Sequence, residues 1–110
     1  MKTIRILPEA ERDLECAADF YERCGEGLGK YFIDCLISDI ESLRLYAGVH
    51  QCHHGFFRCV SKRFPFSIYY LMVKESVEIY AVLDCRHRPD VNICKVQTRS
   101  KSDLNKEDLA

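Results

Sequence analysis

The fold of this chain is decided by residues 56–90, which read FFRCVSKRFPFSIYYLMVKESVEIYAVLDCRHRPD. Three segments rich in β-branched and aromatic residues follow one another here, at about residues 56–61, 66–73 and 77–84. Gaps this short join strands only as an antiparallel meander. Pro65 separates the first two strands, because proline cannot donate a hydrogen bond to a sheet. We therefore predict a three-stranded antiparallel unit, with its second turn at residues 74–76.

The last predicted strand alternates strictly. Successive side chains of a strand point to opposite faces, so residues two apart share a face. One face would carry the apolar residues Val77, Ile79, Ala81 and Leu83. The other face would carry Glu78, Tyr80, Val82 and Asp84. We expect the apolar face to receive whatever helices the rest of the chain forms.

The first half of the chain predicts a short strand and two helices. Residues 2–7 alternate as a strand, and Pro8 has the fixed φ of a first helical turn. An apolar stripe at helical spacing continues to Gly25, which can adopt the left-handed conformation that ends a helix. A second amphipathic helix is expected over residues 27–46, followed by a loop at 47–55. The two or three residues between the helices force an antiparallel hairpin.

These elements predict an α+β fold with the order β-α-α-β-β-β, in which a helical hairpin packs on one face of a small antiparallel sheet. With 110 residues the chain is long enough for one domain with its own core. We place that domain at residues 1–96. Residues 97–110 are polar and lack apolar periodicity, so we expect a flexible tail.

Composition narrows the classes of function. Residues 1–55 hold 6 Lys+Arg against 10 Asp+Glu, a balance of −4, and residues 56–110 hold 10 against 7, a balance of +3. A sequence pI near 6.4 argues against non-specific coating of nucleic acid. No apolar run reaches the roughly 18 residues of a membrane span, and no signal peptide is recognisable. We expect a cytoplasmic protein with reduced cysteines and no membrane partner.

Cationic residues gather at the turns and the end of the predicted meander. Lys62 and Arg63 lie in its first turn, and Arg86, His87 and Arg88 follow its last strand. Fixed positive charge on a rigid sheet suits a polyanionic or strongly acidic partner. We expect these side chains to share one water-accessible surface. The aromatic residues of the middle strand could stack on bases, but packing within the sheet is the favoured interpretation; they are Phe66, Tyr69 and Tyr70.

Three stretches together resemble the RelE/ParE superfamily, the toxins of bacterial toxin–antitoxin and plasmid-stabilisation modules. They are ILPEAERDLECAADFYE at 6–22, GLGKYFIDCLISDIESL at 27–43 and KRFPFSIYYLMVKESVEIYAVLDCRHRPD at 62–90. The likeness extends from Ile4 to about Asp90, and the combination is specific although each piece alone is weak. It implies a helical hairpin on a small antiparallel sheet. It also implies a cognate antitoxin as partner, typically through a segment that folds on binding.

The resemblance implies two alternative activities. ParE-like members bind DNA gyrase and poison it, whereas RelE-like members cut mRNA on the ribosome, as metal-independent endoribonucleases. Arg58 matches the position of a catalytic Lys in RelE-like enzymes, but Ser67 stands where they carry a transition-state Arg, and Val60 where another Lys is expected. A Tyr that they use beyond the last strand is also missing. The matching therefore favours the gyrase branch.

Under the ribonuclease alternative the implied catalytic residues are Arg58, Lys62, Arg63, Arg86 and His87. His87 could act as acid or base near neutral pH. Under either alternative the implied binding residues are Arg58, Lys62, Arg63, Arg86 and Arg88. A degenerate, non-toxic family member is a further possibility. Apolar faces left by a departed antitoxin could also drive formation of a homodimer.

The loop HQCHH at residues 50–54 is not explained by the resemblance. Histidine and cysteine are ligands that Zn²⁺ accepts. Spacings of one or two residues cannot wrap all of them around one tetrahedral ion, and no second ligand pair at customary spacing follows. We therefore predict neither a metal site nor a cofactor, and keep a Cys/His metal or redox sensor as a lesser alternative.

Overall fold

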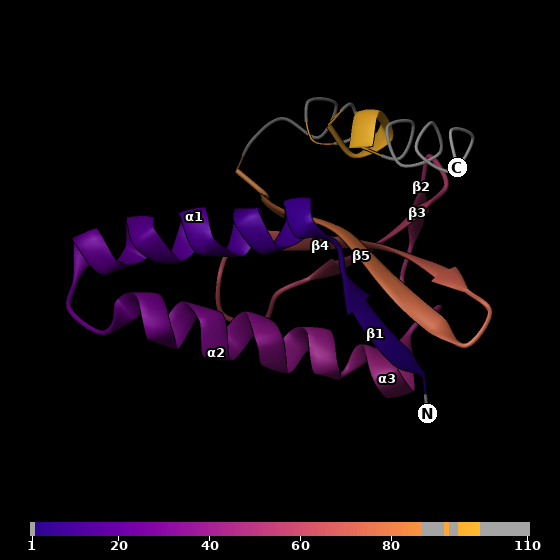
Figure 1. Cartoon of the computed structure of the whole chain (residues 1–110), viewed down its shortest axis with the longest axis horizontal. Coiled ribbons are helices and arrows are strands. Elements are labelled where there is room, and N and C mark those ends of the chain that lie inside the picture. Colours follow the sequence, from indigo (N-terminus) through magenta and orange to yellow (C-terminus); the bar gives the residue numbers. More distant parts are fainter. Residues whose placement is uncertain (1, 87–91, 93–94, 100–110) are drawn as a thin grey trace.

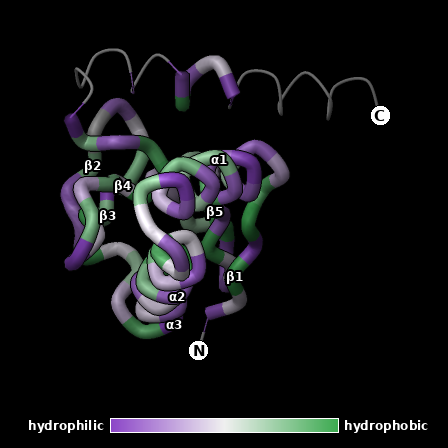
Figure 2. The backbone as a smooth tube through the Cα atoms, turned by 90° about the vertical axis from the view of Figure 1, so that its left-hand side faces the viewer, coloured by the Kyte–Doolittle hydropathy of each residue, from purple (hydrophilic) through white to green (hydrophobic). Residues whose placement is uncertain are grey.

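Two antiparallel helices cover one face of a five-stranded sheet in the computed structural model, which describes residues 2–86, 92 and 95–99 (Figure 1). The elements in chain order are β1 (Thr3–Ile6), α1 (Pro8–Cys24), α2 (Leu28–Glu41), α3 (Leu43–Tyr46), β2 (Cys52–His53), β3 (Phe56–Val60), β4 (Phe66–Val73) and β5 (Ser76–Asp84). Figure 2 looks along α1 and α2 and shows hydrophobic residues in both layers. The α+β architecture predicted from the sequence is confirmed.

The sheet has the order β1-β5-β4-β3-β2 and is mixed, whereas we expected an antiparallel sheet. β3, β4 and β5 form the predicted antiparallel meander. β1 pairs with β5 in the parallel direction, with Thr3 opposite Ser76 and Ile6 opposite Ile79. Parallel pairing follows because the chain crosses the helical layer between β1 and the meander.

The helical hairpin is closed by one carboxylate. Glu22 accepts hydrogen bonds from the backbone N–H groups of Gly27 and Gly29, both at 3.0 Å, and these bonds lower its pKa. The left-handed residue of the connection is Gly27, with φ 83°. The expectation that Gly25 is left-handed is wrong, since its φ of −176° is extended.

The predicted second helix and the loop after it are subdivided in the structure. Ser42 ends α2 and its Oγ donates to the Asp39 carbonyl at 2.6 Å; the short α3 follows. The predicted loop contains the two-residue strand β2, which pairs with β3. His54 and Gly55 both have positive φ, as a two-residue turn between antiparallel strands requires.

A β-bulge divides the side chains of β5 between two apolar clusters. Tyr69 pairs with Ala81 but Tyr70 pairs with Ile79, so Tyr80 is an extra residue in β5. Val77, Ile79 and Val82 therefore join the main core beneath the helices. On the opposite face of the sheet lie Leu7, Phe56, Tyr69, Tyr80, Ala81, Leu83 and Val96. The expectation of one continuous apolar face on β5 is wrong after Ile79.

Helical residues 95–99 lie against the second cluster. Val96 is fully buried there. The Arg99 guanidinium binds both carboxylate oxygens of Asp13 in α1, at 2.6 and 3.0 Å. Gln97–Arg99 thus belong to this helical stretch; residues 100–110 lie outside the described residues, and the expectation of a flexible tail stays a prediction. None of the helices described is long and apolar enough to cross a membrane.

Candidate functional site at the cationic end of the sheet

The β3–β4 turn and the end of β5 lie at the same end of the sheet. Phe66 pairs with Asp84, and the backbone N–H of Cys85 donates to the carbonyl of Pro65 at 2.7 Å. The site residues predicted from the sequence, where the structure describes them, therefore belong to one region. We call it the cationic end of the sheet.

Arg58 projects from the face of the sheet that points away from α1 and α2, because its neighbours Phe57 and Cys59 pack in the main core. Its Nε donates to Ser67 Oγ at 2.8 Å, and its Nη2 lies 3.8 Å from Cys85 Sγ. The Ser67 hydroxyl is also 2.8 Å from that sulfur. Because Ser67 is fully buried, it holds the half-buried guanidinium in one orientation.

Sequence reasoning missed this Arg58–Ser67–Cys85 cluster. In the sequence, Ser67 is notable only as a position without charge, and nothing there singles out Cys85. Strand periodicity could have placed Arg58 and Ser67 on one face once their register was known. The register itself is visible only in the structure, where Val60 pairs with Ser67.

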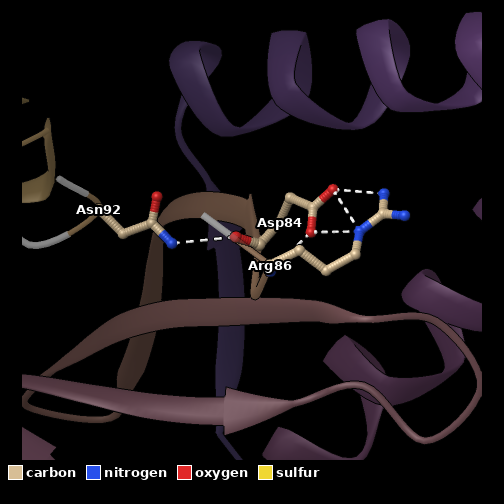
Figure 3. Close-up of polar contacts among 3 residues, drawn as sticks. All are labelled: Asp84, Arg86 and Asn92. Carbon is tan, nitrogen blue, oxygen red and sulfur yellow. Dashed lines mark hydrogen bonds and ion pairs between the residues drawn. The ribbon is translucent and has the colours of Figure 1, made fainter. Parts of the chain in front are cut away.

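Arg86 is held by Asp84, two residues before it (Figure 3). Its Nη2 lies 2.6 Å from Oδ2, and its Nε lies 3.0 and 3.1 Å from the two carboxylate oxygens. These bonds raise the pKa of Arg86. Asn92 Nδ2 donates to the Asp84 carbonyl at 3.0 Å, while its buried Oδ1 has no hydrogen-bond partner among the described residues. The charge of Arg86 is thus offset locally.

Lys62 and Arg63 face α2. The buried Asp39 carboxylate accepts hydrogen bonds from Ser61 Oγ at 2.7 Å and from the Lys62 backbone N–H at 3.3 Å. Arg63 Nη1 donates to the Tyr31 hydroxyl at 3.0 Å. Asp39 therefore fixes the turn, although sequence reasoning did not single it out.

The cationic side chains thus occupy three different settings instead of the single shared surface that we expected. Arg58 lies on the outer face of the sheet, Arg86 is paired with Asp84 beside α1, and Lys62 and Arg63 lie beside α2. The predicted residues His87 and Arg88 lie outside the described residues. The functional roles assigned to these side chains stay predictions.

The aromatic residues of β4 are packing residues. Phe66, Tyr69 and Tyr70 are 7%, 2% and 0% exposed, so none offers a free face for a base. The interpretation favoured from the sequence is therefore correct, and the stacking alternative is excluded for these three residues.

The histidine-rich loop is tied to the core through His50. The Tyr70 hydroxyl accepts from the backbone N–H of Gly48 at 3.0 Å and contacts His50 Nδ1. Burial lowers the pKa of His50, which favours the neutral ring. Within the described part of the chain no three His, Cys, Asp or Glu side chains are grouped as a metal site would require.

No family model matches the sequence, and no curated protein matches it closely enough to show a relationship. A solved structure is similar in fold: a chain of the "Chromosomal ParDE TA system from P. aeruginosa", with a TM-score of 0.69 and 17% sequence identity. The match covers 76% of this chain and 96% of that chain. This chain has a RelE/ParE-like fold. At this low identity, the likeness of the two structures establishes the fold alone.

Proposed function

We propose that this chain is the toxin component of a type II toxin–antitoxin module, of the ParE-like kind, which binds and poisons DNA gyrase. A cognate antitoxin neutralises it by binding. The similarity in fold to a chain of a ParDE toxin–antitoxin system supports the toxin assignment. The motifs quoted from residues 6–22, 27–43 and 62–90 support it independently.

The observation that carries the choice of gyrase over RNA cleavage is the environment of Ser67. By the resemblance, RelE-like ribonucleases place a transition-state Arg here. In this chain the position holds a buried hydroxyl that contacts Arg58 and Cys85 and supplies no charge. Loss of one stabilising donor in comparable oxyanion sites costs about 2.7–4 kcal/mol of transition-state stabilisation.

The other matched positions support the same choice. Val60, where a catalytic Lys is expected, is an apolar side chain that is 53% exposed. Arg58 takes the place of the remaining Lys, but its Nε is engaged by Ser67. A guanidinium fixed in this way is a poor proton acceptor, because Arg remains protonated in proteins. It is well suited to a directional contact with a partner protein.

The experiment is a pair of assays on the purified protein. With gyrase, ATP and relaxed plasmid we expect supercoiling to fail and cleaved plasmid to accumulate. With translating ribosomes we expect primer extension on the mRNA to give no codon-phased cuts. Arg58→Ala should weaken the gyrase effect, whereas Arg12→Ala, an exposed position on α1, should leave it unchanged.

Each of the other results has a defined meaning. Codon-phased cuts with normal supercoiling would establish the RelE-like ribonuclease and overturn the proposal. Normal results in both assays would identify a non-toxic member of the fold. Full gyrase poisoning by Arg58→Ala would keep the target but remove Arg58 from the contact surface.

A further inference from the structure

A groove of about 500 Å³ lies between α2 and the β3–β4 turn. Figure 1 shows this turn, between β3 and β4, reaching the side of α2. Six of its lining residues matter here: Tyr31, Asp34, Ser38 and Asp39 from α2, and Lys62 and Arg63 from the turn. We call it the α2–turn groove. Its volume lies within the range of about 300–1,000 Å³ that is typical of ligand pockets.

Both carboxylates of the α2–turn groove are already engaged. Asp39 accepts the hydrogen bonds from Ser61 Oγ and the Lys62 backbone. Asp34 accepts from Lys30 Nζ at 3.0 Å, one helical turn away on the solvent side of α2. Neither carboxylate bonds to the cationic side chain of Lys62 or Arg63.

The two cations of the groove therefore form no ion pair with its carboxylates, and Asp39, bonded by neutral donors, offsets only one of the two positive charges. Arg63 donates to the neutral hydroxyl of Tyr31, and within residues 2–86, 92 and 95–99 neither Arg63 nor Lys62 forms an ion pair. The hydroxyl of Ser38 adds another donor to the lining. The groove thus holds two cationic donors, one of them bonded to the Tyr31 oxygen, and the hydroxyl groups of Tyr31 and Ser38.

The turn that carries both cations is attached to α2. Asp39 is only 8% exposed, and its two hydrogen bonds attach the β3–β4 turn to α2. Arg63 is attached to α2 a second time through Tyr31. Binding to a turn attached in this way loses less conformational entropy than binding to a mobile loop.

We propose that the α2–turn groove binds carboxylate side chains from an acidic segment of a partner protein. A nucleic acid is disfavoured, because its phosphates repeat along an extended backbone and require a continuous basic surface. Lys62 and Arg63 are two adjacent cations in a short groove, which suits a short acidic segment better than a long phosphate backbone. The identity of the partner rests on the proposed function: if that function holds, the antitoxin supplies the segment.

The test is a titration of the ¹⁵N-labelled full chain with acetylated hexaglutamate amide, followed by NMR. We expect saturable shifts of the Tyr31, Lys62 and Arg63 amides that weaken as NaCl is raised. Lys62→Glu/Arg63→Glu should lower the affinity about tenfold, the effect of losing two exposed ion pairs. Lys62→Gln/Arg63→Gln, which removes the charges without reversing them, should lower it about threefold.

The matched control is Arg12→Glu/Arg23→Glu, which changes the net charge equally at two exposed positions on α1. An equal loss of affinity in this control would mean non-specific attraction and would overturn the proposal. Shifts of the groove amides by hexathymidylate or inorganic phosphate at lower concentration than by the peptide would also overturn it. None of these measurements involves gyrase, so failure here and failure of the gyrase proposal are distinguishable.

Discussion

Replacing Asp13 tests whether residues 95–99 stabilise the domain. The Asp13 carboxylate binds the Arg99 guanidinium at 2.6 and 3.0 Å, and its Oδ2 accepts from the Val82 backbone N–H at 3.0 Å. Arg99 also donates to the Tyr80 carbonyl at 3.2 Å. Asp13 thus joins both the bulge in β5 and the C-terminal helical residues to α1, and Arg99 also lies 3.8 Å from the Glu9 carboxylate of the same helix.

The expected magnitude follows from the exposure of this pair. Hydrogen bonds to charged groups contribute about 1.5–3 kcal/mol each, and breaking a buried pair costs about 3–5 kcal/mol. Asp13 and Arg99 side chains are 15% and 20% exposed, so water partly compensates the remaining partner. We expect Asp13→Ala to lower the free energy of unfolding by about 2–3 kcal/mol. Asp13→Asn keeps an oxygen for Val82 and should lower it by about 1–2 kcal/mol.

The assay is urea unfolding followed by circular dichroism, in a reducing buffer because six free cysteines are present among the described residues. A loss of this size moves the midpoint by about 1–2 M urea. The double mutant Asp13→Ala/Arg99→Ala isolates the pair, with an expected coupling energy of about 1–2 kcal/mol. Additivity of the two single changes within about 0.5 kcal/mol would refute the reasoning.

Three further changes test other contacts. Gly29→Ala places a methyl group 2.7 Å from the Ala18 carbonyl oxygen and should lower the free energy of unfolding by about 1–3 kcal/mol, measured as a lower Tm. Burial lowers the pKa of His50, so the unfolded chain binds the proton more readily and the free energy of unfolding should decrease as pH falls below about 6.5. Ser67→Ala leaves Arg58 Nε without its acceptor and should cost about 1–2 kcal/mol in urea unfolding.

Each of these changes has its own control. Gly25→Ala should cost less than Gly29→Ala, because its methyl group meets only the flexible end of Leu28 at 3.0 Å; equal losses would contradict the backbone clash. His50→Gln should reduce the fall in the free energy of unfolding at acid pH. An unchanged pH profile would mean that another group causes this fall. Unchanged stability of Ser67→Ala would mean that water replaces the hydroxyl without loss.

The helices and strands were predictable because each depends on a local pattern. Pro8, the acidic first turn and the apolar stripe predict α1 from the sequence alone, and the structure begins and ends this helix at Pro8 and Cys24. The position of the bulge depends instead on the register between β4 and β5, which no local pattern in β5 contains. Strict alternation therefore predicted the faces of Val77 and Ile79 correctly and failed for Ala81, Val82 and Leu83.

The candidate site was predictable in its location but not in its contacts. Charged residues at turns and strand ends gather at one end of a meander, as the placement of Lys62, Arg63 and Arg86 in the chain implied. Their surroundings depend on partners distant in sequence: Asp39 precedes Lys62 by 23 residues, and Cys85 follows Arg58 by 27. Such partners become neighbours only after the sheet and helices have packed.

The extra residue in β5 has a consequence for insertions and deletions in this chain. Because Tyr80 shifts the phase of the strand, odd-numbered residues before it (Val77, Ile79) and an even-numbered residue after it (Val82) face the main core. Deleting Tyr80 would exchange the sides of Ala81, Val82 and Leu83 together, and would carry Asp84 away from its present position. Loss of this one residue would therefore rearrange both apolar clusters and the ion pair between Asp84 and Arg86. A substitution of Tyr80 would alter only the cluster that contains its side chain.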